Sequence, residues 1–158
     1  MQIFHPYPDI NKSLRCLSKQ RLGKQRVEAY QVINTIINSG GWKHHPVTLM
    51  YKDFLPYLIH YYNECLIEFE RTGGKNIKLQ LMDHGPVITP PFIGDDKLHE
   101  SHRQNLWRKA NLDSQGFKDD GISHKKVSYD QLCVLEREKV PRLSNYMTFP
   151  YYWPHQYK

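Results

Sequence analysis

The sequence has few cysteines, and their spacing suits neither disulfides nor metal binding. The three cysteines, Cys16, Cys65 and Cys133, are far apart and odd in number, and no two have Cys-x-x-Cys spacing. This pattern excludes a disulfide-stabilised scaffold and favours reduced thiols in a cytosolic setting. No paired base for a cysteine nucleophile is evident in the sequence, so thiol catalysis is not expected.

Several other signals are missing from the chain. No apolar run approaches the roughly 20 residues that a membrane span needs, and the first residues, Met-Gln-Ile-Phe-His-Pro, lack the pattern of a secretory signal. We therefore expect a cytoplasmic or otherwise intracellular protein that is neither secreted nor bound to a membrane. The sequence also lacks internal repeats, low-complexity tracts and a glycine-rich phosphate loop.

Acidic residues are scarce in the first third of the chain. Residues 1–50 contain seven lysines and arginines but only two acids, and so carry +5 of the net charge of +6. Clustered positive charge suits a polyanionic partner, because each neutralised phosphate releases condensed counterions. An ordinary solvated helix face would show the same clustering, so charge alone leaves both interpretations open.

The apolar spacing predicts helices. Residues 18–38 repeat apolar side chains at the spacing of one buried helix face, and Gly40-Gly41 follows as a stop. A second helical stretch is expected to begin at Pro46, which suits a first helical position, and to run to about Thr72. Pro56 should kink this stretch or split it in two.

The second half of the chain is less regular. Residues 75–94 are rich in proline and glycine and predict a wrapping loop, after which Asp95-Asp96 opens a helix to about Ala110. No convincing alternation of apolar and polar residues indicates a strand. We therefore predict an all-α fold: one compact helical bundle with long loops over residues 1–158, in which residues 111–145 form an insertion or extended linker.

One carboxylate stands out within the first long helix. Arg21, Gln25 and Glu28 fall on one face of a helix, at the edge of its apolar stripe. A carboxylate there can be partly desolvated beside cations, which makes it a tunable acid or base. The alternative is an ordinary pair of glutamate and arginine on a helix surface, which contributes only a few tenths of a kcal/mol.

The motifs resemble a known family. The runs LSKQRLGKQRVE and GWKHHP, followed by PPFIGDDKLHESHRQNLWRK and a closing YYWP, are similar to a bacterial and phage family related to the pyrimidine-dimer DNA glycosylases. The resemblance covers roughly residues 1–72, 84–110 and 148–154. It preserves the spacing of a leucine six residues before a glutamate, here Leu22 and Glu28.

The resemblance implies a mechanism. In that glycosylase type an α-amino group attacks C1′ of a flipped-out nucleoside, the base leaves, and β-elimination nicks the strand, with a glutamate assisting sugar opening and proton transfer. Glu28 takes the role of that glutamate. Residue 2 is Gln, which is too large for normal methionine removal, so the attacking amine would belong to Met1.

The resemblance also implies a double-stranded DNA partner and no cofactor. Basic side chains would grip phosphates and the aromatic tail would contact DNA. The residues placed in these roles are Arg21, Lys24, Arg26, His45, His102, Arg103, Arg108, Lys109, Tyr151, Tyr152 and Trp153. For the three tail aromatics, the alternative is that they cap the core.

The histidines offer a weaker signal. His99 and His102 have a spacing of three with Glu100 between them, a fragment of a metal site, but no second matched pair of ligands accompanies them. His102 lies between apolar positions, which favours a core histidine with one satisfied hydrogen bond. We therefore predict no metal site.

Three functional hypotheses follow. The first is a DNA glycosylase, with or without lyase activity at an abasic (AP) site, acting on a damaged or modified base. The second is a non-catalytic nucleic-acid binder that keeps the fold, for example as a component of a larger assembly. The third, a metal-dependent nuclease, requires the histidines to converge.

Overall fold

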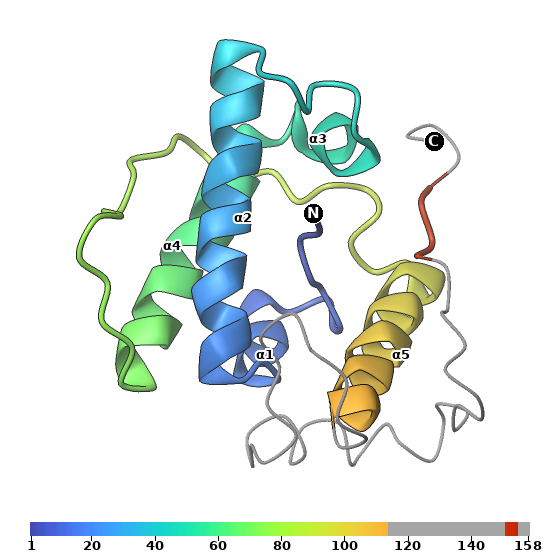
Figure 1. The fold of residues 1–158 in the computed structure, drawn as a ribbon. Helices are drawn as coiled ribbons and strands as arrows, with labels where there is room; N and C mark the ends of the chain where they lie inside the picture. Colours follow the sequence, from blue (N-terminus) through green and yellow to red (C-terminus); the bar gives the residue numbers. More distant parts are fainter. Residues whose placement is uncertain (114–150, 155–158) are drawn as a thin grey trace.

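The computed structural model describes residues 1–113 and 151–154 of the chain, and these residues contain helices and no strand (Figure 1). The helices are α1 (Ile10–Arg15), α2 (Lys19–Asn38), α3 (Pro46–Tyr51), α4 (Leu55–Arg71) and α5 (Asp96–Asp113). The predicted all-α class is confirmed. The predicted insertion at 111–145 falls almost wholly outside the described residues.

The long helices α2 and α4 form the most extensive helix pair of the fold. Leu22, Ala29 and Ile33 from α2 are completely buried, as are Leu58 and Cys65 from α4. These positions recur four or seven residues apart and place an apolar stripe of each helix against the other. The buried stripe of α2 fixes the orientation of every other side chain on that helix.

The predicted break near Pro56 is confirmed. The stretch divides into α3 and α4, and residues 52–54 separate the two helices. Pro56 lies in the first turn of α4. Backbone N–H groups in a first turn have no partner within the helix, so a proline there costs no hydrogen bond. The chain can therefore turn before this proline and continue as a new helix.

The ends of α1 and α2 are capped by side chains. Asp9 accepts a hydrogen bond from the backbone N–H of Lys12 at 2.7 Å, and Ser18 accepts one from Arg21 at 3.2 Å. At its other end, α2 terminates on Ser39, whose φ of 52° is left-handed. The sequence predicted a stop at Gly40, one residue later. In the structure the left-handed position is occupied by Ser39 instead.

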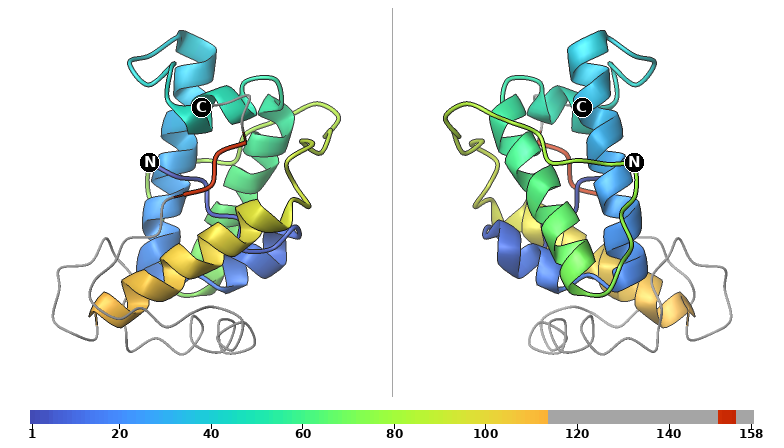
Figure 2. Two further views of the ribbon diagram at one scale, coloured as in Figure 1. Left: turned by 90° about the vertical axis from the view of Figure 1, so that its right-hand side faces the viewer. Right: turned by 90° about the vertical axis from the view of Figure 1, so that its left-hand side faces the viewer.

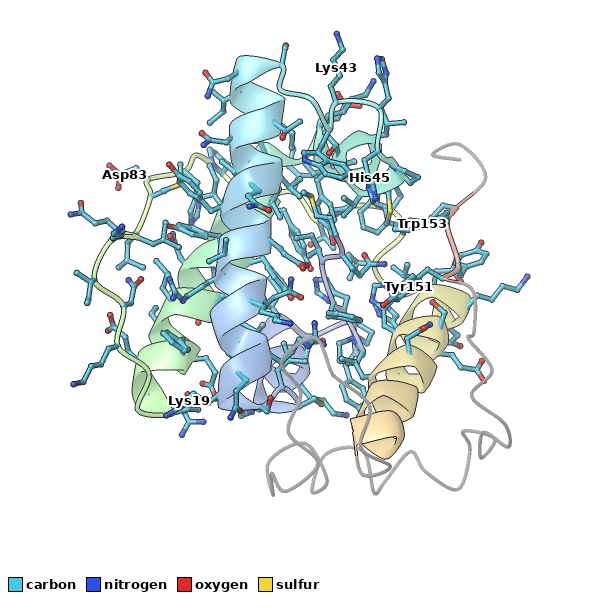
Figure 3. All side chains as sticks on the ribbon, viewed as in Figure 1. Lys19, Lys43, His45, Asp83, Tyr151 and Trp153 are labelled. Atoms are coloured by element: carbon cyan, nitrogen blue, oxygen red, sulfur yellow. The ribbon has the colours of Figure 1, made fainter. Side chains whose placement is uncertain are left out.

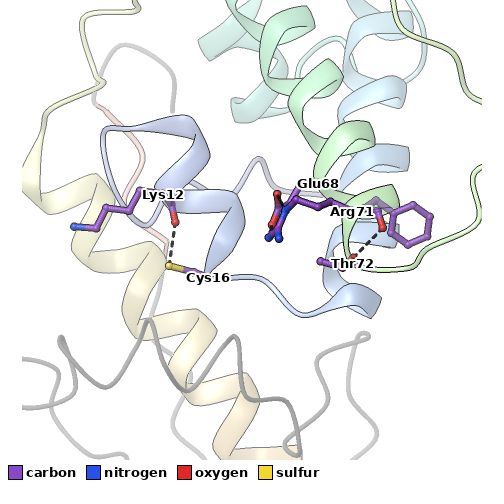
Figure 4. A network of polar contacts seen from close by, with 6 residues as sticks. Lys12, Cys16, Glu68, Arg71 and Thr72 are labelled. Carbon is purple, nitrogen blue, oxygen red and sulfur yellow. Dashed lines mark hydrogen bonds and ion pairs between the residues drawn. The ribbon is translucent and has the colours of Figure 1, made fainter.

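The end of α4 is secured by local hydrogen bonds (Figure 4). The hydroxyl of Thr72 donates to the carbonyl of Phe69 at 2.8 Å, and the N–H of Gly74 donates to the same carbonyl at 2.9 Å. Arg71 pairs with the carboxylate of Glu68, with its Nε 2.9 Å from Oε2. The predicted glycine stop is confirmed here, since Gly73 has a φ of +88° that favours glycine.

The segment after α4 lies along the outside of the helices before it reaches α5 (Figures 1 and 2). Asn63 holds this segment with two hydrogen bonds, to the N–H and the carbonyl of Met82, at 2.9 and 2.8 Å. The hydroxyl of Tyr62 donates to the carbonyl of Gln80 at 2.7 Å. The predicted wrapping loop is thus tied to α4. None of the helices in the described part is long and apolar enough to cross a membrane.

The first residues of the chain run through the centre of the molecule (Figure 1). All of residues 2–7 are buried, and they lie between α2 and α5. The tail at 151–154 lies on the side of α5 and α3 (Figure 2). The amino end of the chain, α2 and the tail are therefore neighbours, although they are far apart in sequence.

Candidate functional site

The amino-terminal segment is held against α2 by a buried glutamine. The Oε1 of Gln25 accepts the backbone N–H of Phe4 at 2.8 Å, and its Nε2 donates to the carbonyl of Gln2 at 2.7 Å. Tyr61 of α4 completes the arrangement, because its hydroxyl donates to the carbonyl of Phe4 at 2.7 Å and lies 3.1 Å from Oε1 of Gln25. Gln25 is only 1% exposed, so these bonds are shielded from water and fix the position of the segment.

This arrangement brings the start of the chain to Glu28. The backbone N–H of Gln2 donates to Oε2 of Glu28 at 3.1 Å, and Nε2 of Gln25 lies 3.5 Å from the same oxygen. Glu28 is half-buried, as is Met1. Met1 is one residue from the Gln2–Glu28 bond, so its α-amine lies in the immediate neighbourhood of the carboxylate.

Tyr61 is sensitive to the same carboxylate. Burial raises the pKa of the Tyr61 phenol well above its ordinary value, and the charge of Glu28 contributes in the same direction. The phenol therefore stays protonated and remains a hydrogen-bond donor at physiological pH. This donor holds the carbonyl of Phe4 in the amino-terminal segment.

His45 also lies near the amino end of the chain. Its Nδ1 accepts the backbone N–H of Val47 at 3.1 Å, which caps α3 and leaves the ring proton on Nε2. Partial burial lowers the pKa of His45, and the positive charge of the amino terminus lowers it further. His45 is therefore a neutral donor close to the start of the chain at physiological pH.

An open groove of about 720 Å³ extends along α2 from Glu28. Apolar atoms of Val27 and Phe69 contribute to its lining, and the side chains of Lys19 and Lys24 are exposed beside them. The full lining is Lys19, Gln20, Gly23, Lys24, Val27, Glu28, Gln31 and Phe69. The groove thus offers an apolar surface, two ammonium groups and one carboxylate to a bound molecule.

The basic residues of α2 differ in their surroundings. Lys24 is exposed, whereas Arg21 is only 3% exposed and its guanidinium lies 5.3 Å from the ring centroid of Phe4. Arg26 is half-buried, lies over the ring of Phe69 and donates to Asn76 at 3.0 Å. Of the three arginines and lysines expected to meet phosphates on this helix, Lys24 is the one presented to solvent.

Two candidate residues of α5, His102 and Arg103, bind the backbone of the amino-terminal segment. His102 is 1% exposed and its Nδ1 accepts the backbone N–H of His5 at 2.8 Å. Arg103 is half-buried and donates to the carbonyl of Pro6 at 2.8 Å. His102 is therefore a core histidine, as its apolar neighbours predicted.

The side chains of Arg108 and Lys109 lie outside the described residues, although their backbone belongs to α5. Among the residues that the structure describes, no group of three or more histidines, cysteines or acids could hold a metal ion. Instead, His99 donates from Nδ1 to the carbonyl of His5 at 2.7 Å and accepts the N–H of Gly94 at 2.9 Å. The buried histidines His99 and His102 therefore each hold a backbone group of the amino-terminal segment through Nδ1.

The tail aromatics are half-buried and packed against the core. The ring of Tyr151 lies 6.1 Å from that of Phe4, and the ring of Trp153 lies 5.9 Å from that of His45 (Figure 3). The backbone N–H of Tyr152 donates to the hydroxyl of Ser101 at 3.2 Å. The tail therefore joins the region around the amino end and keeps part of its aromatic surface exposed.

Some residues of the site were not predicted from the sequence. Gln25 was placed on the face of Glu28, but its bonds to the amino-terminal segment had no sequence signal, and neither did the participation of Tyr61. Trp42, an exposed residue in the connection between α2 and α3, was not predicted as a functional residue either. The sequence did carry a signal for this residue. The tryptophan stands beside Lys43 and two histidines in a short connection between helices, and aromatic and cationic residues together suit nucleic-acid binding.

The features described define a class of protein: a helical protein whose amino end is fixed beside a carboxylate, next to a groove edged by lysines. Residues 1–81 match the family model described as pyrimidine dimer DNA glycosylase. This match covers just over half of the chain, and the chain belongs to that family. A glycosylase-type function on DNA follows at the level of the family. No curated protein and no solved structure matches the chain.

Proposed function

We propose that this protein removes a damaged or modified base from double-stranded DNA by using the α-amine of Met1 as nucleophile and Glu28 as acid and base. The 3.1 Å bond between the N–H of Gln2 and Oε2 of Glu28 carries the proposal, because it fixes the start of the chain beside a carboxylate. The same proposal locates its activity inside the cell, where the DNA is.

The chemistry proceeds in balanced steps. The nitrogen of the unprotonated amine forms a bond to C1′ of the target nucleoside, and the bond from C1′ to the base breaks with its electron pair leaving on the base, which is then protonated. Glu28 accepts a proton from the nitrogen after this attack and donates it to O4′ as the bond from C1′ to O4′ breaks, so that the sugar opens and an iminium forms between the amine and C1′. Loss of a proton from C2′ then expels the 3′ phosphate, and water hydrolyses the imine to restore the amine.

The groove beside Glu28 provides the binding surface. Its apolar lining suits the face of a base taken out of the stack, and Lys19 and Lys24 provide charge for the neighbouring phosphates. Val27 and Phe69 contribute no hydrogen-bond donors from their side chains, so the lining selects for shape and stacking more than for one base. A damaged base that leaves the stack at low cost is the expected target.

Trapping with borohydride tests the lyase chemistry. The protein is incubated with an abasic duplex and, in parallel, with an ultraviolet-irradiated duplex in the presence of borohydride, which reduces the imine to a stable amine. We expect a covalent adduct that mass spectrometry of peptides locates at the α-nitrogen of Met1. Selective acetylation of that amine, with the lysines left unmodified, is expected to abolish the adduct while DNA binding persists.

Two variants separate catalysis from binding. Glu28→Gln is expected to lose turnover and to retain DNA affinity, whereas Lys24→Glu is expected to weaken affinity and lower the salt dependence. Retained DNA binding without any adduct or base release, in the unmodified protein, would falsify the enzymatic proposal. That outcome would identify a non-catalytic DNA binder, such as a component of a larger assembly.

A further inference from the structure

The connection between α2 and α3 exposes a tryptophan that the proposed chemistry does not use. Trp42 is 55% exposed, and Lys43 and His44, which follow it, are exposed as well. A large aromatic ring in water forfeits the free energy that its burial would contribute. Aromatic rings flanked by cations are typical of surfaces that bind nucleic-acid strands, where bases stack on the ring and phosphates meet the charge.

The position of Trp42 is fixed through His45. The ring of Trp42 lies 5.8 Å from that of His45 at an interplanar angle of 72°, and the ring of Trp153 lies 5.9 Å from His45 at 89°. His45 is itself held by the hydrogen bond that its Nδ1 accepts from Val47. The three rings therefore form one aromatic cluster, defined as Trp42, His45 and Trp153, in which the central ring has a fixed orientation.

The aromatic cluster lies next to the amino end of the chain. In Figure 1 the amino terminus lies close to α3, and Figure 3 shows His45 and Trp153 on that side of the molecule. The charge of the amino terminus is close enough to affect the ionisation of His45. Met1 and Trp153 are both partly buried and each packs against the core. A strand whose target nucleoside meets the amine would continue toward this cluster.

We propose that Trp42 stacks a nucleobase of the bound DNA strand beside the target nucleotide, with Lys43 neutralising an adjacent phosphate. The inference deepens the proposed function and rests on it for the location of the target. The exposed ring, the neighbouring positive charge and the continuity with the amino end select a DNA strand as the occupant. His45 and Trp153 act as positioning residues for the Trp42 ring.

Binding of a duplex that cannot react tests this inference apart from the chemistry. The probe is a short fluorescein-labelled duplex with one tetrahydrofuran abasic analogue, whose sugar cannot form an imine. Trp42→Ala is expected to weaken binding by about 5- to 150-fold, and Trp42→Phe is expected to retain most of the affinity because it keeps a stacking ring. Ile67→Ala, at a similarly exposed apolar residue on α4, is the matched control and is expected to leave affinity unchanged.

Tryptophan fluorescence and salt dependence give independent readouts. Stacking is expected to quench the fluorescence of Trp42, so part of the quenching by DNA should disappear in Trp42→Phe although the duplex remains bound. Lys43→Gln is expected to reduce the slope of log affinity against log salt by about 0.9. Circular dichroism confirms that each variant is folded.

The outcomes separate this inference from the proposed function. If Trp42→Ala binds the duplex as tightly as the unmodified protein, stacking on Trp42 is excluded, whether or not the borohydride adduct forms. If the adduct is absent while Trp42→Ala weakens binding, the stacking site stands and the chemistry is excluded. Equal losses in Trp42→Ala and Ile67→Ala would also overturn the inference, because they would point to a nonspecific apolar effect.

Discussion

Gln2 and Glu28 are joined by a hydrogen bond of 3.1 Å from the backbone N–H to the carboxylate oxygen Oε2. Residue 28 lies in the middle of α2, while residue 2 is at the start of the chain, so the bond closes a loop through the centre of the fold. The carboxylate of Glu28 therefore anchors the amino-terminal segment and also lies near the α-amine of Met1. Substitutions at Glu28 must be designed to separate these roles.

Glu28→Gln is such a substitution. The amide oxygen still accepts the N–H of Gln2, so the segment stays in place, but an amide cannot act as a general acid or base. We expect excision and strand nicking to fall by about 100- to 10,000-fold, the range typical of a lost acid or base. Single-turnover nicking of damaged duplex gives the rate, and denaturation in urea checks that stability changes little. A variant with the rate of the unmodified protein would assign another acid or base.

Gln25→Leu tests the anchor itself. The substitution leaves the backbone N–H of Phe4 and the carbonyl of Gln2 buried without their partners, which costs about 1–3 kcal/mol for each group. We expect a loss of about 2–6 kcal/mol in the free energy of unfolding, measured with urea, together with loss of activity. Gln31→Leu, on the exposed face of the same helix, is the control and should change stability by less than about 0.5 kcal/mol. Equal stability of the two variants would contradict the anchoring role.

Acid is expected to unfold the protein through its buried histidines. Burial lowers the pKa of His5 from 6.5 to about 4, and burial also lowers the pKa of His99 and His102. The charge of Arg103 acts in the same direction on the latter two, while Asp9, Asp95 and Asp96 act in the opposite direction on His5 or His99.

The sign of the effect follows from proton binding. Between pH 6.5 and about pH 4, the unfolded chain binds more protons than the folded one, so stability present above this window is lost as the pH falls through it. His5 alone accounts for about 3 kcal/mol. Urea unfolding across this pH range measures the slope. His102→Asn, whose amide oxygen can accept the N–H of His5, should flatten the slope, and an unchanged slope would contradict the assignment.

Ser39→Gly is expected to stabilise the protein. Ser39 ends α2 with a φ of 52°, a left-handed conformation that costs a residue with a Cβ roughly 1 kcal/mol and glycine almost nothing. Glycine loses more backbone entropy on folding, which offsets part of the gain. We expect a net gain of about 0.5 kcal/mol, visible as a higher urea midpoint. Ser39→Ala is the matched control and should show no gain.

Helices were predictable because their signals are local. The apolar repeat of α2 and Pro56 before the interior of α4 each act within a few residues. These signals depend on backbone geometry that every helix shares. They sufficed to place Glu28 at the edge of a buried stripe, together with Gln25.

The burial of the amino-terminal segment had to come from tertiary structure. The bonds from Phe4 to Gln25 and from His5 to His102 join residues 21 and 97 positions apart, and no periodicity in the sequence encodes such pairings. The same holds for Arg21, which helix geometry placed beside Glu28 but which is covered because Phe4 packs against it.

The sequence by itself determined the helices, the face of α2 that carries Glu28, and the family. Only the packed chain decided that the first residues would pass through the interior and bring the amino end to that carboxylate. The reason is physical: helix boundaries depend on neighbouring residues, whereas the course of an extended segment depends on which buried partners satisfy its backbone N–H and carbonyl groups. Gln25 and Tyr61 provide those partners, and they come from two different helices.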